Sequence, residues 1–177
     1  AYPDISYYND VETLNAYNEL EAKGTDQQTL MKLVHKQSRD NARSPMQWNT
    51  SANAGFSEGT PWLMVNDNFT EINVEDQEND PNSILNFYRK MISLRKQHKT
   101  LVYGDYKCYN EDNDQSFFYK RWDDDGMFLI LLNFTGNALT VDINEDLLNY
   151  TSVISNYHNT LTSEPLKPWE ARLLKRL

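Results

Sequence analysis

MFLILLNF, residues 127–134, is a nearly continuous apolar run, and it marks the C-terminal half of the chain as β structure. A run of this kind is typical of a central strand that is covered on both faces. An acidic turn, residues 123–126, precedes it, and residues 116–122 carry a second strand pattern before that turn. We therefore expect an antiparallel hairpin over residues 116–134.

Strand patterns recur on both sides of this hairpin. In WEARL, the residues Trp169, Ala171 and Leu173 share a face, and LTVDI alternates in the same way, which predicts a sheet with one solvent-facing side. We expect the C-terminal half to be an antiparallel β-sandwich. The expected strands are residues 102–108, 116–122, 127–134, 139–143, 152–156 and 169–174.

The residues before position 100 show helix and loop patterns instead. A first helix is expected over residues 10–23, with Gly24 as its stop. Thr25 and Gln28 form a capping box for a second helix, which Pro45 is expected to end. The apolar stripes are Val11, Leu14 and Tyr17 in the first helix and Leu30, Met31, Leu33 and Val34 in the second.

A long irregular segment and a third helix complete this half. Residues 46–78 show no sustained period, so they are expected to form extended loop structure. The third helix is expected over residues 80–99, with Asp80 as its N-cap and Pro81 at the first helical position. Its apolar stripe, which needs a surface to pack on, consists of Ile84, Leu85, Tyr88, Met91 and Ile92.

The composition narrows the classes of partner. Lys and Arg total 17 against 26 Asp and Glu, and the net charge of -9 argues against nucleic acid or an anionic membrane as the main partner. Cys108 is the only cysteine, so no internal disulfide can form, and a reducing, cytoplasmic setting fits best. The sequence also contains Asn-x-Ser/Thr sites, which accept N-glycans in secreted proteins, so secretion remains an alternative. These sites lie at Asn49, Asn68, Asn133 and Asn149.

Nothing in the sequence marks a metal site or a nucleophile. The histidines sit in no ligand spacing, and there is no Gly-x-Ser-x-Gly motif and no phosphate-binding glycine loop. Cys108, within a strand-like segment, is expected to be a packed residue. We therefore expect no metal and no cofactor.

SRDNARSPMQW, residues 38–48, is the segment with the most distinctive chemistry, and it places Arg39 and Arg43 near the end of the second helix. If Asp40 or another acid pairs with Arg39, the planar guanidinium could grip a hydroxyl or a second carboxylate. The segment also reads as a surface salt bridge at a helix end. The aromatic residues that follow fit either the floor of a sugar site or loop anchors, and they are Trp48, Phe56, Trp62 and Phe69.

Four segments of the chain carry a family resemblance. They are YYNDVETLN (residues 7–15), SRDNARSPMQW, the stretch from NAGFSEGTPW to KTLVYG (residues 53–104) and LKPWEARL (residues 166–173). Together they resemble the C-terminal part of α-glucosidases in the α-amylase superfamily, most closely the oligo-1,6-glucosidase, isomaltase and maltase type. The resemblance spans essentially the whole chain.

This resemblance implies a fold: a (β/α)8 catalytic barrel followed by an antiparallel β-domain. Residues 1–100 would be the last loop excursion and the final helix of the barrel, and residues 101–177 would be the C-terminal β-domain. The stripe on the third helix would then pack on barrel strands outside this chain. We expect the chain alone to self-associate through that exposed patch.

The resemblance also assigns residues. Arg39 matches the family arginine that is expected to hold the terminal glucose, together with a carboxylate from an early barrel loop. Arg43 is expected to support it, Glu12 matches an acid near the +1 sugar, and Ser44 stands where threonine is more usual. A retaining glycosidase cuts with two carboxyl groups about 5 Å apart. No segment matches the family motifs that carry them, so we expect no catalytic residue in this chain.

The implied activity is hydrolysis of terminal α-1,6 or α-1,4 glucosidic bonds in short oligosaccharides by a retaining α-glucosidase of which this chain is a segment. Near relatives leave trehalose-6-phosphate hydrolase and sucrose isomerase open. Outside enzymes, a non-catalytic carbohydrate-binding domain or a transporter heavy-chain-like domain remains open. The last of these needs a membrane anchor upstream.

Overall fold

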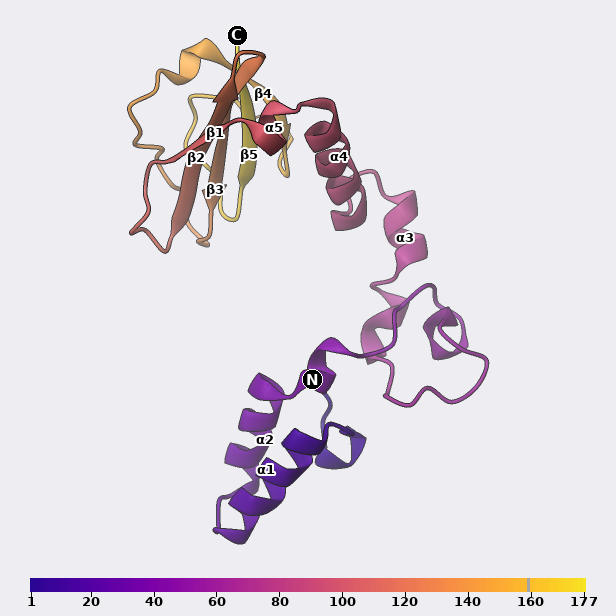
Figure 1. The fold of residues 1–177 in the computed structure, drawn as a ribbon. Helices are drawn as coiled ribbons and strands as arrows, with labels where there is room; N and C mark the ends of the chain where they lie inside the picture. The colour runs from indigo at the N-terminus through magenta and orange to yellow at the C-terminus, as the bar shows by residue number, and fades with distance from the viewer. Residues whose placement is uncertain (159) are drawn as a thin grey trace. The chain divides into compact units, whose positions relative to one another are not determined.

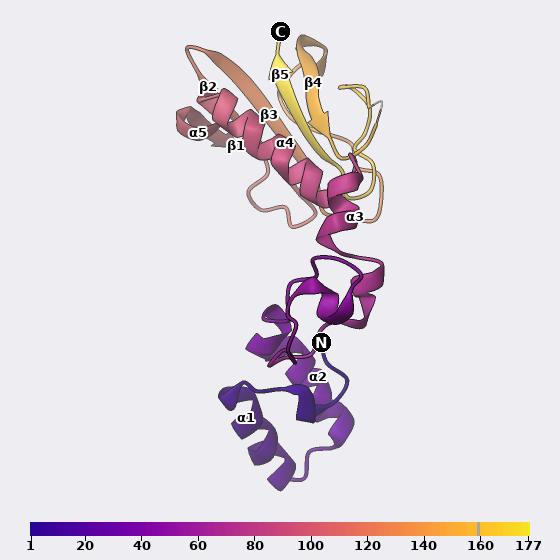
Figure 2. The same ribbon diagram turned by 90° about the vertical axis from the view of Figure 1, so that its right-hand side faces the viewer.

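The computed structural model describes residues 1–158 and 160–177, and the chain divides into two compact units, residues 1–85 and 86–177 (Figure 1). The first unit consists of helices and loops, and the second is an antiparallel sheet with helices beside it (Figure 2). No helix among the described residues is long and apolar enough to cross a membrane. The chain is therefore an α+β protein with its helical segments first and its strands last.

A helical hairpin organises the first unit. It is formed by α1 (Val11–Ala22) and α2 (Gln27–Gln37). Gly24 lies in the turn between them with a φ of +85°, a left-handed conformation that favours glycine, so the predicted stop is confirmed. The apolar core of this unit joins the hairpin to the N-terminal segment and one loop residue, and its buried members are Tyr2, Tyr8, Tyr17, Leu30, Val34 and Leu63.

Two details of the hairpin differ from the expectation. Val11 is 67% exposed, so it does not belong to the buried face of α1. The N-cap of α2 is Asp26, whose side chain accepts a hydrogen bond from the N–H of Thr29 at 3.0 Å. The predicted capping box at Thr25 is therefore wrong. The N–H of Thr25 bonds instead to the carbonyl of Leu20, which keeps Thr25 in the turn that closes α1.

The second helix ends earlier than predicted, and this changes the setting of both arginines. α2 stops before Ser38 because Ser38 adopts an extended conformation, with a ψ of 132°. Ser38 then caps a short 3-10 turn, Arg39–Ala42, by accepting a hydrogen bond from the N–H of Asp40 at 3.3 Å. Arg39 lies on this turn and Arg43 directly follows it, so neither belongs to the helix.

The segment after this turn is largely irregular, as predicted. The buried Ala54 holds part of it together, because its carbonyl accepts hydrogen bonds from the N–H groups of Trp48 and Asn49 at 2.8 and 3.2 Å. A short helix that was not predicted, α3 (Val74–Asn79), follows an N-cap at Asn73. Besides the one at Arg39, the described residues form 3-10 turns at Ile5–Tyr7, Ala52–Gly55, Asp67–Thr70 and Leu147–Asn149.

The third predicted helix corresponds to α4 (Ile84–Gln97), which begins later than expected. Residues 81–83 form a turn after α3, so the predicted N-cap at Asp80 is wrong. Leu94 packs into the core of the second unit. Much of the predicted apolar stripe is uncovered in the described chain, with exposures of 73% at Ile84, 65% at Tyr88 and 51% at Ile92.

The second unit is built on a five-stranded antiparallel sheet with the strand order β1-β2-β3-β5-β4. β3 is the central strand and is covered on both faces, as predicted. Leu129 and Leu131 belong to one apolar cluster, and Phe128 and Ile130 belong to another. β2 and β3 form the predicted hairpin. The strands are β1 (Asp105–Cys108), β2 (Ser116–Asp123), β3 (Gly126–Asn133), β4 (Tyr150–Ser155) and β5 (Ala171–Arg176).

Two strand predictions extend too far toward the N-terminus. Residues predicted to begin the first strand form instead a short helix, α5 (Thr100–Tyr103), which inserts Leu101 into the core of the sheet. Trp169 precedes β5 with a φ of +57° and is 62% exposed. It therefore does not share a strand face with Ala171 and Leu173, and that part of the prediction is wrong.

The predicted strand over residues 139–143 is reduced to an isolated bridge between Leu139 and Leu166. Both residues join the apolar cluster on the face of the sheet that includes Leu129 and Leu131. This bridge and its loops cover that face. The described residues show one sheet, and the second sheet of a sandwich stays a prediction.

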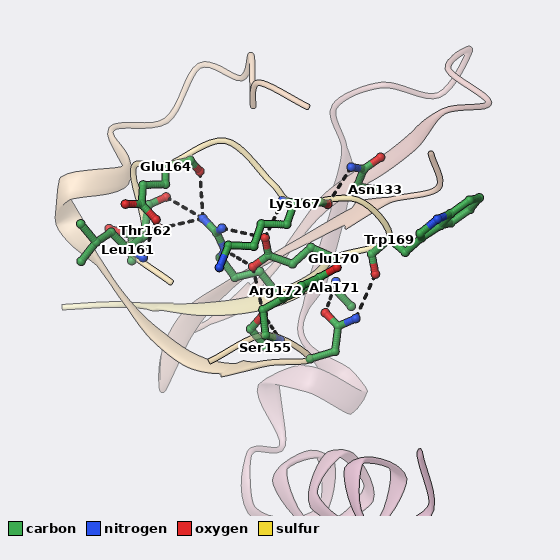
Figure 3. A network of polar contacts seen from close by, with 12 residues as sticks. Asn133, Ser155, Leu161, Thr162, Glu164, Lys167, Trp169, Glu170, Ala171 and Arg172 are labelled. Atoms are coloured by element: carbon green, nitrogen blue, oxygen red, sulfur yellow. Dashed lines mark hydrogen bonds and ion pairs between the residues drawn. The ribbon is translucent and has the colours of Figure 1, made fainter. Parts of the chain in front are cut away.

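A buried ion pair fastens a loop to the start of β5 (Figure 3). The side chains of Glu170 and Arg172 are fully buried, and Nε of Arg172 donates to Oε1 of Glu170 at 2.9 Å. Nη1 of Arg172 lies 2.8, 3.3 and 3.1 Å from the main-chain oxygens of Leu161, Thr162 and Glu164. Because the charges are paired and hydrogen-bonded, the core accommodates them.

Candidate functional site

The structure brings Asp10, at the start of α1, into contact with Arg39, on the turn after α2. Both Nε and Nη2 of Arg39 donate to Oδ1 of Asp10, at 3.0 and 2.5 Å. The hydrogen bond from Arg39 is the main cause that lowers the pKa of Asp10 to about 2, and the same contact raises the pKa of Arg39. The Asp10 side chain is 4% exposed and the Arg39 side chain is 52% exposed, so the cation of this pair faces solvent.

Asp40 does not form a hydrogen bond with its neighbour Arg39, although it is fully buried beside it. Its Oδ2 accepts hydrogen bonds from the main-chain N–H groups of Asn9 and Asp10, both at 2.7 Å. Oδ1 has no hydrogen-bond partner among the described residues, and Nη1 of Arg43 lies 3.7 Å from it. Arg43 therefore contacts Asp40, and Asp40 is linked to Arg39 indirectly, through its hydrogen bond from the main chain of Asp10.

Glu12, in the first turn of α1, lies at the outer edge of the same cluster. Its Oε2 is 3.5 Å from Nη2 of Arg39, and its side chain is 81% exposed. The structure thus places the three predicted site residues, Arg39, Glu12 and Arg43, around two carboxylates, Asp10 and Asp40. The acid that pairs with Arg39 is Asp10, which had no predicted role, and not its neighbour Asp40. The binding roles of the three residues stay predictions.

Asp10 occupies an N-cap position, but its carboxylate makes no capping hydrogen bond. Its Oδ2 accepts instead from Oγ1 of Thr13 at 2.7 Å, and Thr13 Oγ1 is 3.0 Å from Oγ of Ser38. An aspartate at the start of a helix is a common capping residue, so its position in the sequence pointed to a local role. Its main partner, Arg39, lies 29 residues away, and no local pattern indicates that contact.

A cavity of about 220 Å³ lies between the two helices of the hairpin and adjoins the Asp10–Arg39 pair. Charged groups of Asp10, Glu12 and Arg39 therefore border the same space as apolar side chains. Binding pockets commonly combine an apolar lining with a few polar groups that fix the orientation of a ligand. The apolar side chains of this lining are Ala16, Tyr17, Leu20, Leu30, Leu33 and Val34.

The aromatic residues of the irregular loop are partly accessible. Trp48 is 48% exposed, Phe56 43% and Trp62 62%. The Trp62 segment is tied to the arginine cluster, because Nδ2 of Asn9 donates to the carbonyl of Trp62 at 2.8 Å. A stacking role for these rings, including Phe69, stays a prediction.

In residues 1–158 and 160–177, no group of three or more His, Cys, Asp and Glu side chains is placed to hold an ion. Cys108 is half-buried at the end of β1, and its Sγ donates to the main-chain oxygen of Phe118 at 3.5 Å.

Comparison with known proteins gives consistent matches over the chain. Residues 4–104 match a family model described as the catalytic domain of alpha amylase. The chain is 42% identical over 178 residues to an oligo-1,6-glucosidase of Halalkalibacterium halodurans, and the match covers 97% of this chain and 32% of that protein.

Two solved structures extend these matches to the fold. One is trehalose-6-phosphate hydrolase of Bacillus licheniformis, with a TM-score of 0.90 and 36% identity over 98% of this chain and 33% of that chain. Another is isomaltulose synthase of Erwinia rhapontici, with a TM-score of 0.86 and 32% identity over 98% of this chain and 32% of that chain. The chain thus spans about a third of the length of the relatives it matches.

Proposed function

Because the chain belongs to the α-amylase family, we propose that it forms part of a retaining α-glucosidase. The substrates are short oligosaccharides with terminal α-1,6 or α-1,4 glucosidic bonds, which fits the oligo-1,6-glucosidases at about 40% identity. One observation of the site carries the proposal: two segments far apart in the sequence meet to hold the guanidinium of Arg39 on Asp10 while leaving it accessible.

In this proposal Arg39 donates hydrogen bonds to hydroxyl groups of the terminal glucose. Its charge is compensated by Asp10 at 2.5 Å and by Glu12 at 3.5 Å, which suits a neutral hydroxyl better than an anionic group. Glu12, highly exposed beside it, contacts the next sugar. Arg43 supports the cluster through Asp40.

The residues that cut the bond lie outside this chain in our proposal. Retaining glycosidases need a nucleophilic carboxylate and an acid/base carboxyl group about 5 Å apart. Glu12 is an accessible carboxylate at the edge of the cluster, but the inner carboxylates, Asp10 and Asp40, are buried and already hydrogen-bonded, so the cluster offers no pair of free carboxyl groups. The inner carboxylates fit binding and support, and the remaining two thirds of the relatives' length can supply the reacting groups.

We assign residues 1–100 to the end of a (β/α)8 catalytic domain, as its last loop excursion and final helix, and residues 101–177 to a C-terminal β-sandwich domain. The match to the catalytic-domain model, which ends at residue 104, supports this division. We place the protein in the cytoplasm, acting on small oligosaccharides without nucleic acid or membrane partners.

Trehalose-6-phosphate hydrolysis and sucrose isomerisation are second candidates, because solved structures of both kinds of enzyme are similar to this chain. The charge compensation around Arg39 favours an uncharged sugar over trehalose 6-phosphate, and the oligo-1,6-glucosidases at about 40% identity favour the glucosidase over sucrose isomerisation. Product analysis with isomaltose, maltose, sucrose and trehalose 6-phosphate separates these activities. Release of glucose from isomaltose or maltose supports the proposal, and turnover of trehalose 6-phosphate or sucrose alone overturns it.

The role of Arg39 is tested by Arg39→Ala in the complete protein that contains this chain. A charge-assisted hydrogen bond contributes about 1.5–3 kcal/mol, so we expect kcat/KM for the glucoside to fall about 10- to 100-fold. Lys32→Ala is the matched control, because Lys32 is an exposed cation of α2 away from the cluster. If the Arg39→Ala enzyme has the same kcat/KM as the control, Arg39 does not bind the substrate.

A further inference from the structure

The guanidinium of Arg39 is held along one edge. Nε and Nη2 both donate to the same oxygen of Asp10, and Nη2 is also near Glu12. No contact of Nη1 is found among the described residues, and the side chain is half exposed. A planar donor held along one edge presents its other edge in a fixed direction.

Asp10 is itself immobilised on both sides. Its second oxygen accepts from Thr13, which is linked in turn to Ser38, the residue before Arg39. Its main-chain N–H donates to Asp40, the residue after Arg39, at 2.7 Å. Hydrogen bonds therefore connect the segment around Asp10 to the residues on both sides of Arg39.

These connections all lie in poorly accessible parts of the unit. Asp10 is 5% exposed, Thr13 9%, Ser38 7% and Asp40 fully buried. Hydrogen bonds in such places exchange little with water, and the carboxylates keep their orientation. The arrangement thus supplies a rigid base beneath an accessible cation.

We propose that Asp10 is a positioning residue for the sugar-binding function of Arg39. Its carboxylate fixes which edge of the guanidinium faces the substrate, and it compensates the charge so that a neutral hydroxyl is the preferred acceptor. Asp10 does not touch the substrate, because its oxygens are occupied by Arg39 and Thr13. This inference rests on the proposed function, since it assigns Asp10 to the same site.

The test is a double-mutant cycle in the complete protein, with Asp10→Asn, Arg39→Ala and both together. Asp10→Asn keeps the shape of the side chain and removes the charge that holds the guanidinium. Because small misplacements of binding groups cost up to about 100-fold, we expect kcat/KM to fall at least about tenfold. In the Arg39→Ala background the same change should have almost no further effect on kcat/KM, because Asp10 acts through Arg39.

Glu19→Gln is the matched control. Glu19 is a carboxylate on the same helix and also pairs with a cation, Lys23 at 2.6 Å, but it is 68% exposed and away from the cluster. This variant should keep the unaltered kcat/KM. Asp10→Glu, which keeps the charge on a longer side chain, should recover part of the activity lost in Asp10→Asn and covers the case in which Asp10→Asn folds poorly.

The outcomes separate this inference from the proposed function. If Arg39→Ala reduces kcat/KM and Asp10→Asn does not, the inference is wrong and the function stands. If Asp10→Asn causes the same fold-loss with and without Arg39, Asp10 acts on the structure in general and the inference is again overturned. If the complete protein hydrolyses no glucoside, the proposed function is wrong. If Arg39→Ala is fully active, Arg39 is not part of the substrate site, and the role inferred for Asp10 is wrong with it.

Discussion

Glu145 shows how hydrogen bonds outweigh burial at one carboxylate. Its side chain is 16% exposed, and it accepts hydrogen bonds from Tyr109 at 2.5 Å, from Tyr150 at 2.8 Å and from Lys120 at 2.9 Å. Burial raises the pKa of Glu145, but these bonds lower it more, to about 2. The carboxylate thus links the segment before β4 to residues on and near β2.

This network predicts a pH dependence of stability. A glutamate in an unfolded chain has a pKa of about 4.3, so the depressed folded pKa stabilises the protein above about pH 4.3. That contribution is lost as the pH falls from about 4.3 toward 2. We expect Glu145→Gln to lower the free energy of unfolding by about 1–3 kcal/mol at neutral pH, with the gap to the unaltered protein narrowing across that acidic range.

Thermal or urea unfolding at a series of pH values measures this gap. Asp142→Asn is the control, because Asp142 is an exposed acid of the same segment and should show no comparable gap at any pH. A Glu145→Gln gap that is constant from pH 7 to pH 3 would contradict the prediction.

Asp10 shows why the sequence singled out Arg39 but not the acid that pairs with it. The motif around Arg39 identified that residue by resemblance. The choice of partner depends on Ser38, whose extended backbone ends α2 and turns Asp40 inward, toward the main chain of Asn9 and Asp10. A single backbone angle at a helix end is not encoded by hydrophobic periodicity, and so the pairing across the hairpin had no local signal.

Some helices and strands were predicted correctly from their sequence patterns, and others were missed. The central strand β3 and its hairpin were predicted because an apolar run and an acidic turn act locally. The short helix α5 was missed because residues such as Val102 and Tyr103 favour strands, yet the tertiary fold bends the chain there. Leu101 fills the core of the sheet and Thr100 Oγ1 donates to Asp123 at 2.7 Å.

The junction between α5 and β1 predicts a site of steric intolerance. A Cβ on Gly104 would lie 2.6 Å from the main-chain oxygen of Thr100 and 2.8 Å from that of Trp122. Because neither oxygen can move alone, we expect Gly104→Ala to lower the free energy of unfolding by about 1–3 kcal/mol.

Gly136→Ala is the matched control for this substitution. The nearest atom to its Cβ would be Nε1 of Trp169 at 3.8 Å, which is an ordinary contact. Chemical denaturation of the two variants measures the difference. Equal stability of Gly104→Ala and Gly136→Ala would show that the junction relaxes freely.

At the scale of the whole chain, the change from helices to strands near residue 100 was visible in the sequence, whereas the composition of the compact units was not. The second unit begins at residue 86 and so includes most of α4. Leu94 of α4 and Leu101 of α5 pack into the same cluster as residues of the sheet. Such contacts between a helix and later strands depend on the tertiary fold, which local periodicity does not report.

The uncovered stripe of α4 predicts self-association of the 177-residue chain. Contiguous exposed apolar side chains favour contact with another surface. We expect light scattering to give a mass that rises with concentration above that of one chain, and Tyr88→Gln with Ile92→Gln to reduce this rise. Leu148→Gln is the control, because Leu148 is 72% exposed in a separate 3-10 turn. A monodisperse monomer at all concentrations would contradict the prediction.

The buried guanidinium of Arg172 contacts a loop on one side and Glu170 on the other, and the two sides differ in how well they tolerate substitution. Its three loop contacts go to the main-chain oxygens of Leu161, Thr162 and Glu164. Every residue type has such an oxygen, so these contacts do not depend on which side chains the loop carries. The loop can therefore change its side chains over evolutionary time while keeping its path. Arg172 and Glu170 have no such freedom, because replacing either one alone would leave the other as an unpaired buried charge.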